Sequence, residues 1–264
     1  KTPAAQGLIR ELAGEGHEIG VHGSYRSFAD GDLLAREKAR IEEIAGRPAA
    51  GIRQHHLNLA VPGTWELQAN AGFAYDTSLG FKDRPGFRWG TCFPLYPETA
   101  KGPLPLLELP LAVMDITVPG GPAGWEACRA VAETVAAAGG LLVLLWHPPV
   151  FNPLEMPGAG DLCARVIRHA RERGAWTATA GAIAAWWRRR TASPVGWAAG
   201  DGTLRLSFPA GGEGTAADIL LPPGCTAAVP GQARLLYSDG PRLRVAPLPG
   251  TELPAILEMK YTCS

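Results

Sequence analysis

The sequence predicts an α/β fold, in which parallel strands alternate with helices, followed by a small all-β module. In the first 190 residues, short apolar runs alternate with segments of helical periodicity, which is typical of a parallel sheet or barrel built from βα units. After residue 190 the helical periodicity ends, and short β-like segments separated by Gly, Pro and Asp turns follow. We therefore expect two domains, residues 1–190 and residues 191–264.

Helices are predicted where apolar residues recur every three or four positions and where capping residues stand at the ends. Asp30, for example, precedes an apolar stripe that includes Leu34 and Ile41, and aspartate is a favourable N-cap. A terminating glycine pair follows the first of these segments. The expected helices are residues 4–14, 30–45, 63–71, 124–138, 161–174 and 181–190.

Strands are predicted where short apolar runs end at turn residues. The run 141–146 is wholly apolar, which indicates a strand buried on both faces. Segment 80–103 is rich in Gly, Pro and aromatic residues and is expected to be a loop. The six expected strands of the first domain are residues 18–22, 51–56, 73–77, 106–115, 141–146 and 175–179. The second domain is expected to be a sandwich with strands at residues 203–208, 217–221, 233–238, 242–246 and 253–259.

Composition and charge exclude several classes of function. Lys+Arg 25 balances Asp+Glu 25, so the chain has no excess positive charge for nucleic acid. Its longest apolar run, residues 141–146, is too short to span a membrane. Five widely spaced cysteines with no CxxC pair argue against a disulfide framework or a Cys-rich zinc site. Unpaired cysteines favour a reducing, cytoplasmic compartment.

Four of the six histidines stand at the carboxyl ends of predicted strands, namely His22, His55, His56 and His147. Barrel enzymes place their reactive groups at these ends, and neutral imidazole there suits Zn²⁺ or a similar metal. The alternative for each is a structural hydrogen bond to a loop carbonyl. Because side chains alternate along a strand, we expect His55 and His56 on opposite faces, with at most one in the site.

Three charged residues near these strand ends also call for an explanation. Arg53 shares the predicted face of His55, and a buried positive charge requires a carboxylate partner because an unpaired one is very costly. The alternative for Arg53 is a structural ion pair. Asp76 is either a site residue or, more commonly for this residue type, one that fixes a turn. Asp115 ends the predicted strand 106–115.

Several of these segments resemble the NodB-like polysaccharide deacetylases. Residues 16–24 (GHEIGVHGS) resemble the second motif of that family, residues 51–56 (GIRQHH) its arginine-bearing third motif, and residues 144–148 (LLWHP) its fifth. Residues 75–81 (YDTSLGF) also fit a segment common in the family. The resemblance covers residues 4–185. It implies a distorted barrel and metal-dependent hydrolysis of N-acetyl groups on a carbohydrate.

The resemblance also implies roles for individual residues. His22 matches a metal ligand, Arg53 the arginine that orients a catalytic aspartate, and His147 the general acid. The family's second metal histidine lies four residues after the first, where this chain has Arg26, which cannot ligate. Because His55 stands at a neighbouring strand end, we expect it to take that place. The expected cofactor is a divalent metal, with Zn²⁺ as the first choice.

The family's first motif, an aspartate pair at the end of a strand upstream of GHEIGVH, has no counterpart in this sequence. The expected fold is therefore a NodB-type barrel that lacks its first strand, in an N-terminally truncated chain that is inactive alone. Two functions stay open: a metal-dependent N-acetyl hydrolase, and a non-catalytic deacetylase-like protein that binds carbohydrate or serves as a scaffold. An amidohydrolase-type barrel is disfavoured, because no predicted strand carries a His-x-His pair.

Overall fold

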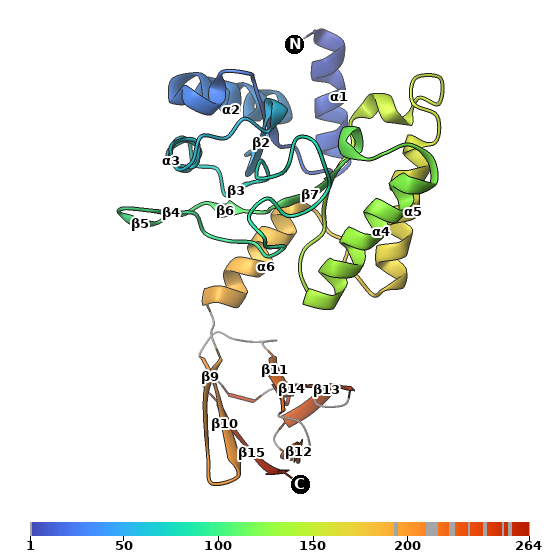
Figure 1. The fold of residues 1–264 in the computed structure, drawn as a ribbon. Coiled ribbons are helices and arrows are strands. Elements are labelled where there is room, and N and C mark those ends of the chain that lie inside the picture. Colours follow the sequence, from blue (N-terminus) through green and yellow to red (C-terminus); the bar gives the residue numbers. More distant parts are fainter. Residues whose placement is uncertain are drawn as a thin grey trace. The chain divides into compact units, whose positions relative to one another are not determined.

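The structure, a computed structural model, describes residues 2–192, 195–209, 216–221, 225–231, 233–239, 242–249, 251–252 and 255–263. The chain divides into two compact units, Lys1–Ala185 and Trp186–Ser264. The first unit contains helices and parallel strands, and the second contains antiparallel strands (Figure 1). No helix in the described ranges combines the length and the apolar character needed to cross a membrane.

The helices form where periodicity and capping residues predict them. α2 (Gly31–Ala45) begins after Asp30, whose carboxylate accepts a hydrogen bond from the Leu33 amide at 2.9 Å. It ends at Gly46, where φ is 68°, a conformation that glycine adopts without a steric penalty. The other α-helices are α1 (Pro3–Gly14), α3 (Gly63–Asn70), α4 (Gly121–Ala138), α5 (Ala159–Glu172) and α6 (Ala180–Ala192).

The strands of the first unit form two parallel sheets. One has the order β1-β2-β3-β6, and the other pairs β7 with β8. These strands are β1 (Val21–Gly23), β2 (Gly51–Gln54), β3 (Tyr75–Asp76), β6 (Leu107–Glu108), β7 (Leu111–Met114) and β8 (Val143–Leu145). A short hairpin, β4 (Glu98–Thr99) and β5 (Gly102–Pro103), lies in the segment expected to be a loop. Because the strands are parallel, their carboxyl ends lie at the same edge of each sheet.

The predicted barrel is not confirmed, since the described parallel strands of the first unit lie in two separate sheets. The expected strand 106–115 is divided into β6 and β7 around Pro110, which has no N–H to donate to a neighbouring strand. Run 141–146 is half-buried rather than fully buried, because β8 has one described strand as its partner. Segment 175–179 was predicted as a strand, but the structure assigns it none, and Trp176 within it is 57% exposed.

Short 3₁₀ helices follow four of the strands at their carboxyl ends. They lie at Ser27–Ala29, His55–Leu57, Asp115–Thr117 and Pro148–Phe151, after β1, β2, β7 and β8 respectively. Each begins a loop that leads from a strand toward the next helix. The strand-end residues predicted to carry chemistry therefore lie in tight turns as well as in the strands themselves.

Gly51 lies against the ring of Tyr75, where a Cβ atom would overlap the phenol. That ring is held in place, because its hydroxyl donates to Glu18 Oε1 at 2.7 Å while Glu18 Oε2 accepts from the Gly181 amide at 2.9 Å. We expect Gly51→Ala to lower the free energy of unfolding, measured by urea denaturation, by about 1–3 kcal/mol. The matched control is Gly7→Ala in α1, where nothing lies within 4 Å and a gain of about 0.5–1 kcal/mol is expected. Equal stability of Gly51→Ala and the parent would contradict this packing.

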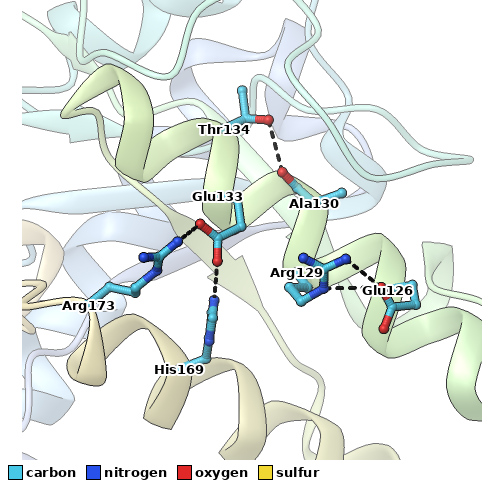
Figure 2. Close-up of polar contacts among 7 residues, drawn as sticks. All are labelled: Glu126, Arg129, Ala130, Glu133, Thr134, His169 and Arg173. Carbon is cyan, nitrogen blue, oxygen red and sulfur yellow. Dashed lines mark hydrogen bonds and ion pairs between the residues drawn. The ribbon is translucent and has the colours of Figure 1, made fainter.

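Helices α4 and α5 are joined by Glu133, as Figure 2 shows. One carboxylate oxygen lies 2.9 Å from His169 Nε2, and the other accepts a hydrogen bond from Arg173. A second ion pair, Arg129 with Glu126 at 2.7 Å, lies within α4. His169, which the sequence places in a helix rather than at a strand end, thus has a structural contact between two helices.

The second unit contains two antiparallel sheets that share one apolar cluster. The sheets have the orders β12-β15-β10-β9 and β11-β14-β13. Leu206, Phe208, Val245 and Met259 are among the buried members of the cluster. The strands are β9 (Gly196–Gly200), β10 (Thr203–Phe208), β11 (Ala217–Leu220), β12 (Cys225–Ala227), β13 (Ala233–Asp239), β14 (Arg242–Pro247) and β15 (Ala255–Cys263).

Cysteine pairing departs from the expectation in this unit. Cys225 is disulfide-bonded, and in the register of β12 and β15 it stands opposite Cys263. Cys92, Cys128 and Cys163 are buried free thiols. The expectation of unpaired cysteines is therefore wrong for Cys225, because strand register brings together residues whose sequence spacing gives no signal. The cysteines consequently no longer favour a reducing compartment.

Candidate active site

The candidate site lies at the carboxyl ends of β1 and β2. These strands pair in parallel with His22 opposite Arg53. β2 ends at Gln54, and the chain turns at once into the 3₁₀ helix His55–Leu57. This turn brings His55 back toward β1, so that residues from two strands separated by a helix lie side by side.

The two histidines predicted as metal ligands are in contact. His22 Nε2 lies 3.1 Å from His55 Nδ1, with the ring centroids 5.2 Å apart. His22 Nδ1 lies 3.0 Å from the carbonyl oxygen of Arg53. Because a carbonyl only accepts, His22 Nδ1 carries the hydrogen and Nε2 presents its lone pair. Burial, and next the electrostatic influence of His55, lower the pKa of His22 below its ordinary value, which favours the neutral imidazole.

The turn after β2 places His56 beside His55 instead of on the opposite face. Their ring centroids are 4.2 Å apart, and the ring of Tyr25 lies 5.9 Å from that of His56. His56 and Leu57 have φ angles of 54° and 51°, which non-glycine residues rarely adopt outside functional or strained sites. The prediction of opposite faces is wrong, because the strand ends at Gln54 and side-chain alternation does not continue beyond it.

Arg53 stands opposite His22 in the register of β1 and β2 and forms no direct ion pair with any described residue. Its Nε donates to the carbonyl oxygen of Thr77 at 3.2 Å. Burial lowers the pKa of Arg53, and the charges of Asp76 and Glu108 oppose that effect. The expected carboxylate partners of Arg53 are thus Asp76 and Glu108, which act on it through space without a direct ion pair among the described residues. Asp76 is fully buried.

His147 forms a dyad with Asp115 that the sequence did not predict. His147 Nδ1 lies 2.8 Å from Asp115 Oδ1, and the His147 amide donates to Asp115 Oδ2 at 2.6 Å. The Asp115 side chain is 1% exposed and that of His147 is 43% exposed. His147 is also the last of the several causes that lower the pKa of His22, which is the electrostatic link between the dyad and the histidine pair. The available signal was that both residues follow the ends of strands, β7 and β8, which pair in parallel.

The structure thus places His22, Arg53 and His55 at adjoining strand ends and pairs His147 with Asp115, for which the sequence predicted a strand end but no role. Two imidazole nitrogens face each other, and a guanidinium and an acid-supported imidazole stand nearby. Within the described ranges no group of three or more His, Cys, Asp or Glu residues is arranged to hold a metal. The contact of His22 with His55 would by itself supply two nitrogen ligands to a metal.

No family model matches this sequence, and no curated protein is significantly similar to it. Solved structures do match. A protein assigned as a polysaccharide deacetylase from Mycobacterium smegmatis is 26% identical with a TM-score of 0.51, over 69% of this chain and 67% of its own length. PuuE allantoinase is 19% identical with a TM-score of 0.54, over 70% of this chain and 63% of its own.

A protein assigned as a polysaccharide deacetylase from Pseudomonas aeruginosa PAO1 is 18% identical with a TM-score of 0.52, over 70% of this chain and 64% of its own. The last two matches are distant in sequence and bear on the fold alone. The chain spans about two thirds of the length of each of these solved structures. This chain therefore has the NodB-like fold of the polysaccharide deacetylases.

Proposed function

We propose that this protein is a metal-dependent hydrolase that removes N-acetyl groups from a carbohydrate, in the manner of a polysaccharide deacetylase. The observation that carries the proposal is the contact of His22 Nε2 with His55 Nδ1 at 3.1 Å. It occurs at the strand ends where barrel enzymes hold their reactive groups, in a fold shared with proteins assigned as deacetylases.

The histidine pair fits a divalent metal. Two nitrogens bound to one tetrahedral Zn²⁺ at 2.0–2.1 Å lie about 3.3 Å apart, close to the observed 3.1 Å. The hydrogen bond from His22 Nδ1 to the Arg53 carbonyl is the kind of contact that orients a ligating histidine. A bound metal, with Zn²⁺ as the first choice, would polarise the acetyl carbonyl and lower the pKa of a bound water.

The remaining residues have complementary roles in the proposed reaction. Asp115 holds the Nδ1–H of His147 and so directs Nε2 away from the dyad. In its protonated form His147 donates a proton to the leaving amine, because an amide anion is too basic to leave. Arg53 keeps its guanidinium charge next to the site and offers hydrogen-bond donors to an anionic group there.

Metal binding tests the proposal directly. We expect the parent protein to bind Zn²⁺ in a defined ratio, and His22→Ala and His55→Ala each to weaken that binding by at least about 100-fold. Calorimetric titration and metal analysis after desalting measure both quantities. His169→Ala is the matched control, because His169 contacts Glu133 between α4 and α5. Stoichiometric Zn²⁺ retained by His22→Ala would rule out the assigned ligand.

A second function is favoured by two observations. Arg26 stands where the family has its second metal histidine, and no three-ligand group occurs among the described residues. Both favour a non-catalytic protein that binds carbohydrate or serves as a scaffold. Binding of N-acetylated oligosaccharides that is insensitive to a chelator, without release of acetate, would support this function. Acetate release that stops on chelation and returns with Zn²⁺ would support the hydrolase.

A further inference from the structure

The four-stranded sheet buries two carboxylic acids side by side. Asp76 on β3 and Glu108 on β6 are both 0% exposed. They are direct partners in the parallel register of these strands, which places their backbones about 4.8 Å apart. Two ionised carboxylates on opposed positions of neighbouring strands, away from water, repel each other strongly. This repulsion disfavours a state in which Asp76 and Glu108 are both ionised.

The hydrogen bonds around the two acids leave one oxygen without a donor. Asp76 Oδ1 accepts from Ser78 Oγ at 2.5 Å. Glu108 Oε2 accepts from Trp65 Nε1 at 2.9 Å, and Glu108 Oε1 accepts from the Leu79 amide at 3.1 Å. Asp76 Oδ2 is buried, and no described residue donates to it. A hydrogen held between the two carboxyl groups would supply the missing donor, since an unsatisfied buried acceptor is costly.

The charges that face the pair support one retained proton. Arg53, on the neighbouring strand β2, is the cation whose charge acts on both acids. Tyr75, adjacent to Asp76, stays neutral because burial and its hydrogen bond to Glu18 raise its pKa. With one proton the pair carries a single negative charge, which balances Arg53. Burial raises the pKa of both acids, and the charge of Asp76 raises that of Glu108 further.

We propose that Asp76 and Glu108 share one proton and act as a single negative charge that positions Arg53 at the candidate site. The contacts connect the two places. Asp76 is followed by Thr77, whose carbonyl accepts the Arg53 Nε–H, and by Ser78, whose hydroxyl accepts from the Gln54 amide at 2.9 Å. Arg53, Asp76 and Glu108 thus each form a hydrogen bond with the short turn of residues 77–79. The proposal holds for a hydrolase and for a binding protein alike.

The variant Asp76→Asn tests the shared proton. Its amide keeps an oxygen for Ser78 and places an N–H where the shared hydrogen lies, so Glu108 is satisfied as a carboxylate. The folded parent keeps a proton that the unfolded chain releases above the ordinary carboxyl pKa of 4.5. The unfolding constant of the parent, relative to Asp76→Asn, is therefore expected to rise with pH by up to about tenfold per pH unit.

Urea denaturation of both proteins from pH 5 to pH 8 measures this ratio. Asp83→Asn is the control, because Asp83 is exposed and paired with Arg84, and it should follow the parent at every pH. Infrared difference spectra provide a second readout. The parent should show the carbonyl band of a protonated carboxylic acid at pH 7, and Asp76→Asn and Glu108→Gln should both lack it.

The positioning of Arg53 has its own readout. Exchange of the Arg53 Nε–H with solvent, followed by NMR, should be equally slow in the parent and in Asp76→Asn, since both keep one negative charge. It should be at least about tenfold faster in the double variant Asp76→Asn/Glu108→Gln; equal exchange rates would overturn the positioning role. A parent without the acid band, with the same pH dependence as Asp76→Asn, would overturn the shared proton. The band is measured on the parent itself, so the test stands even if a variant does not fold.

Discussion

Trp65→Ala is expected to lower the free energy of unfolding by about 3–5 kcal/mol, the typical cost of truncating a large aromatic side chain in a core. Trp65 is 0% exposed and belongs to the cluster that includes Leu34, Ile52 and Phe73. Its removal leaves a cavity and also deprives Glu108 Oε2 of its donor. Urea denaturation followed by circular dichroism measures the loss, because the variant lacks one of the eight tryptophans and its fluorescence is not directly comparable with that of the parent.

Two further variants separate the contributions of volume and hydrogen bonding. Trp65→Phe keeps an aromatic ring but no N–H, and should cost about 1–3 kcal/mol, the penalty for a buried acceptor left unsatisfied. Trp197→Ala is the surface control, because Trp197 is 74% exposed on β9, and a change within about 0.5 kcal/mol is expected there. A loss below about 1 kcal/mol for Trp65→Ala would contradict its place in the core.

Asp115→Asn is expected to lower any release of acetate from N-acetylated oligosaccharides that the parent shows by about 10²–10⁴-fold, the usual contribution of a positioned acid or base. The Asp115 carboxylate fixes His147 through two contacts, at Nδ1 and at the backbone amide. Each carboxylate oxygen accepts a backbone N–H, Oδ1 from Ile116 at 2.7 Å and Oδ2 from His147 at 2.6 Å, so the NH₂ group of asparagine would face one of these donors and disturb the contact with His147. His147 then loses the tautomer that directs Nε2 toward the substrate.

Asp115→Asn should lower turnover without weakening the binding of the metal. Zn²⁺ affinity is expected to stay within about threefold of the parent, because the proposed ligands are His22 and His55 and removal of an outer contact of a true ligand costs at least about tenfold. His147→Gln should reproduce the loss of turnover. Turnover at the parent rate in both variants would show that the dyad takes no part in the reaction.

The neighbourhood of His22, Arg53 and His55 could be predicted from the sequence, because the carboxyl ends of adjacent parallel strands meet at one edge. The relation of His55 to His56 could not, since it depends on the strand ending at Gln54 and on positive φ angles in the next residues. Periodicity carries no signal for either feature.

Contacts between residues on neighbouring strands could not be predicted either, because they depend on the strand register. Asp115 and His147 were each placed at a strand end, but the pairing of β7 with β8 joins them. Glu108 lies inside an apolar run and gave no signal, although its position opposite Asp76 determines the charge of the sheet interior. Segment 175–179 has the composition of a strand but no neighbouring strand in the described structure, so its backbone groups lack sheet partners.

The hydrogen bond from the Gly181 amide to Glu18 has a consequence for how the first unit folds. The two residues are 163 positions apart in the chain. A contact at that separation carries a large loop-closure entropy unless the intervening chain has already become compact. It is therefore expected to form late, after the successive βα units have folded one upon another. Glu18, which lies in the segment GHEIGVH near the start of the unit, is thus expected to gain this hydrogen bond only in the last steps of folding.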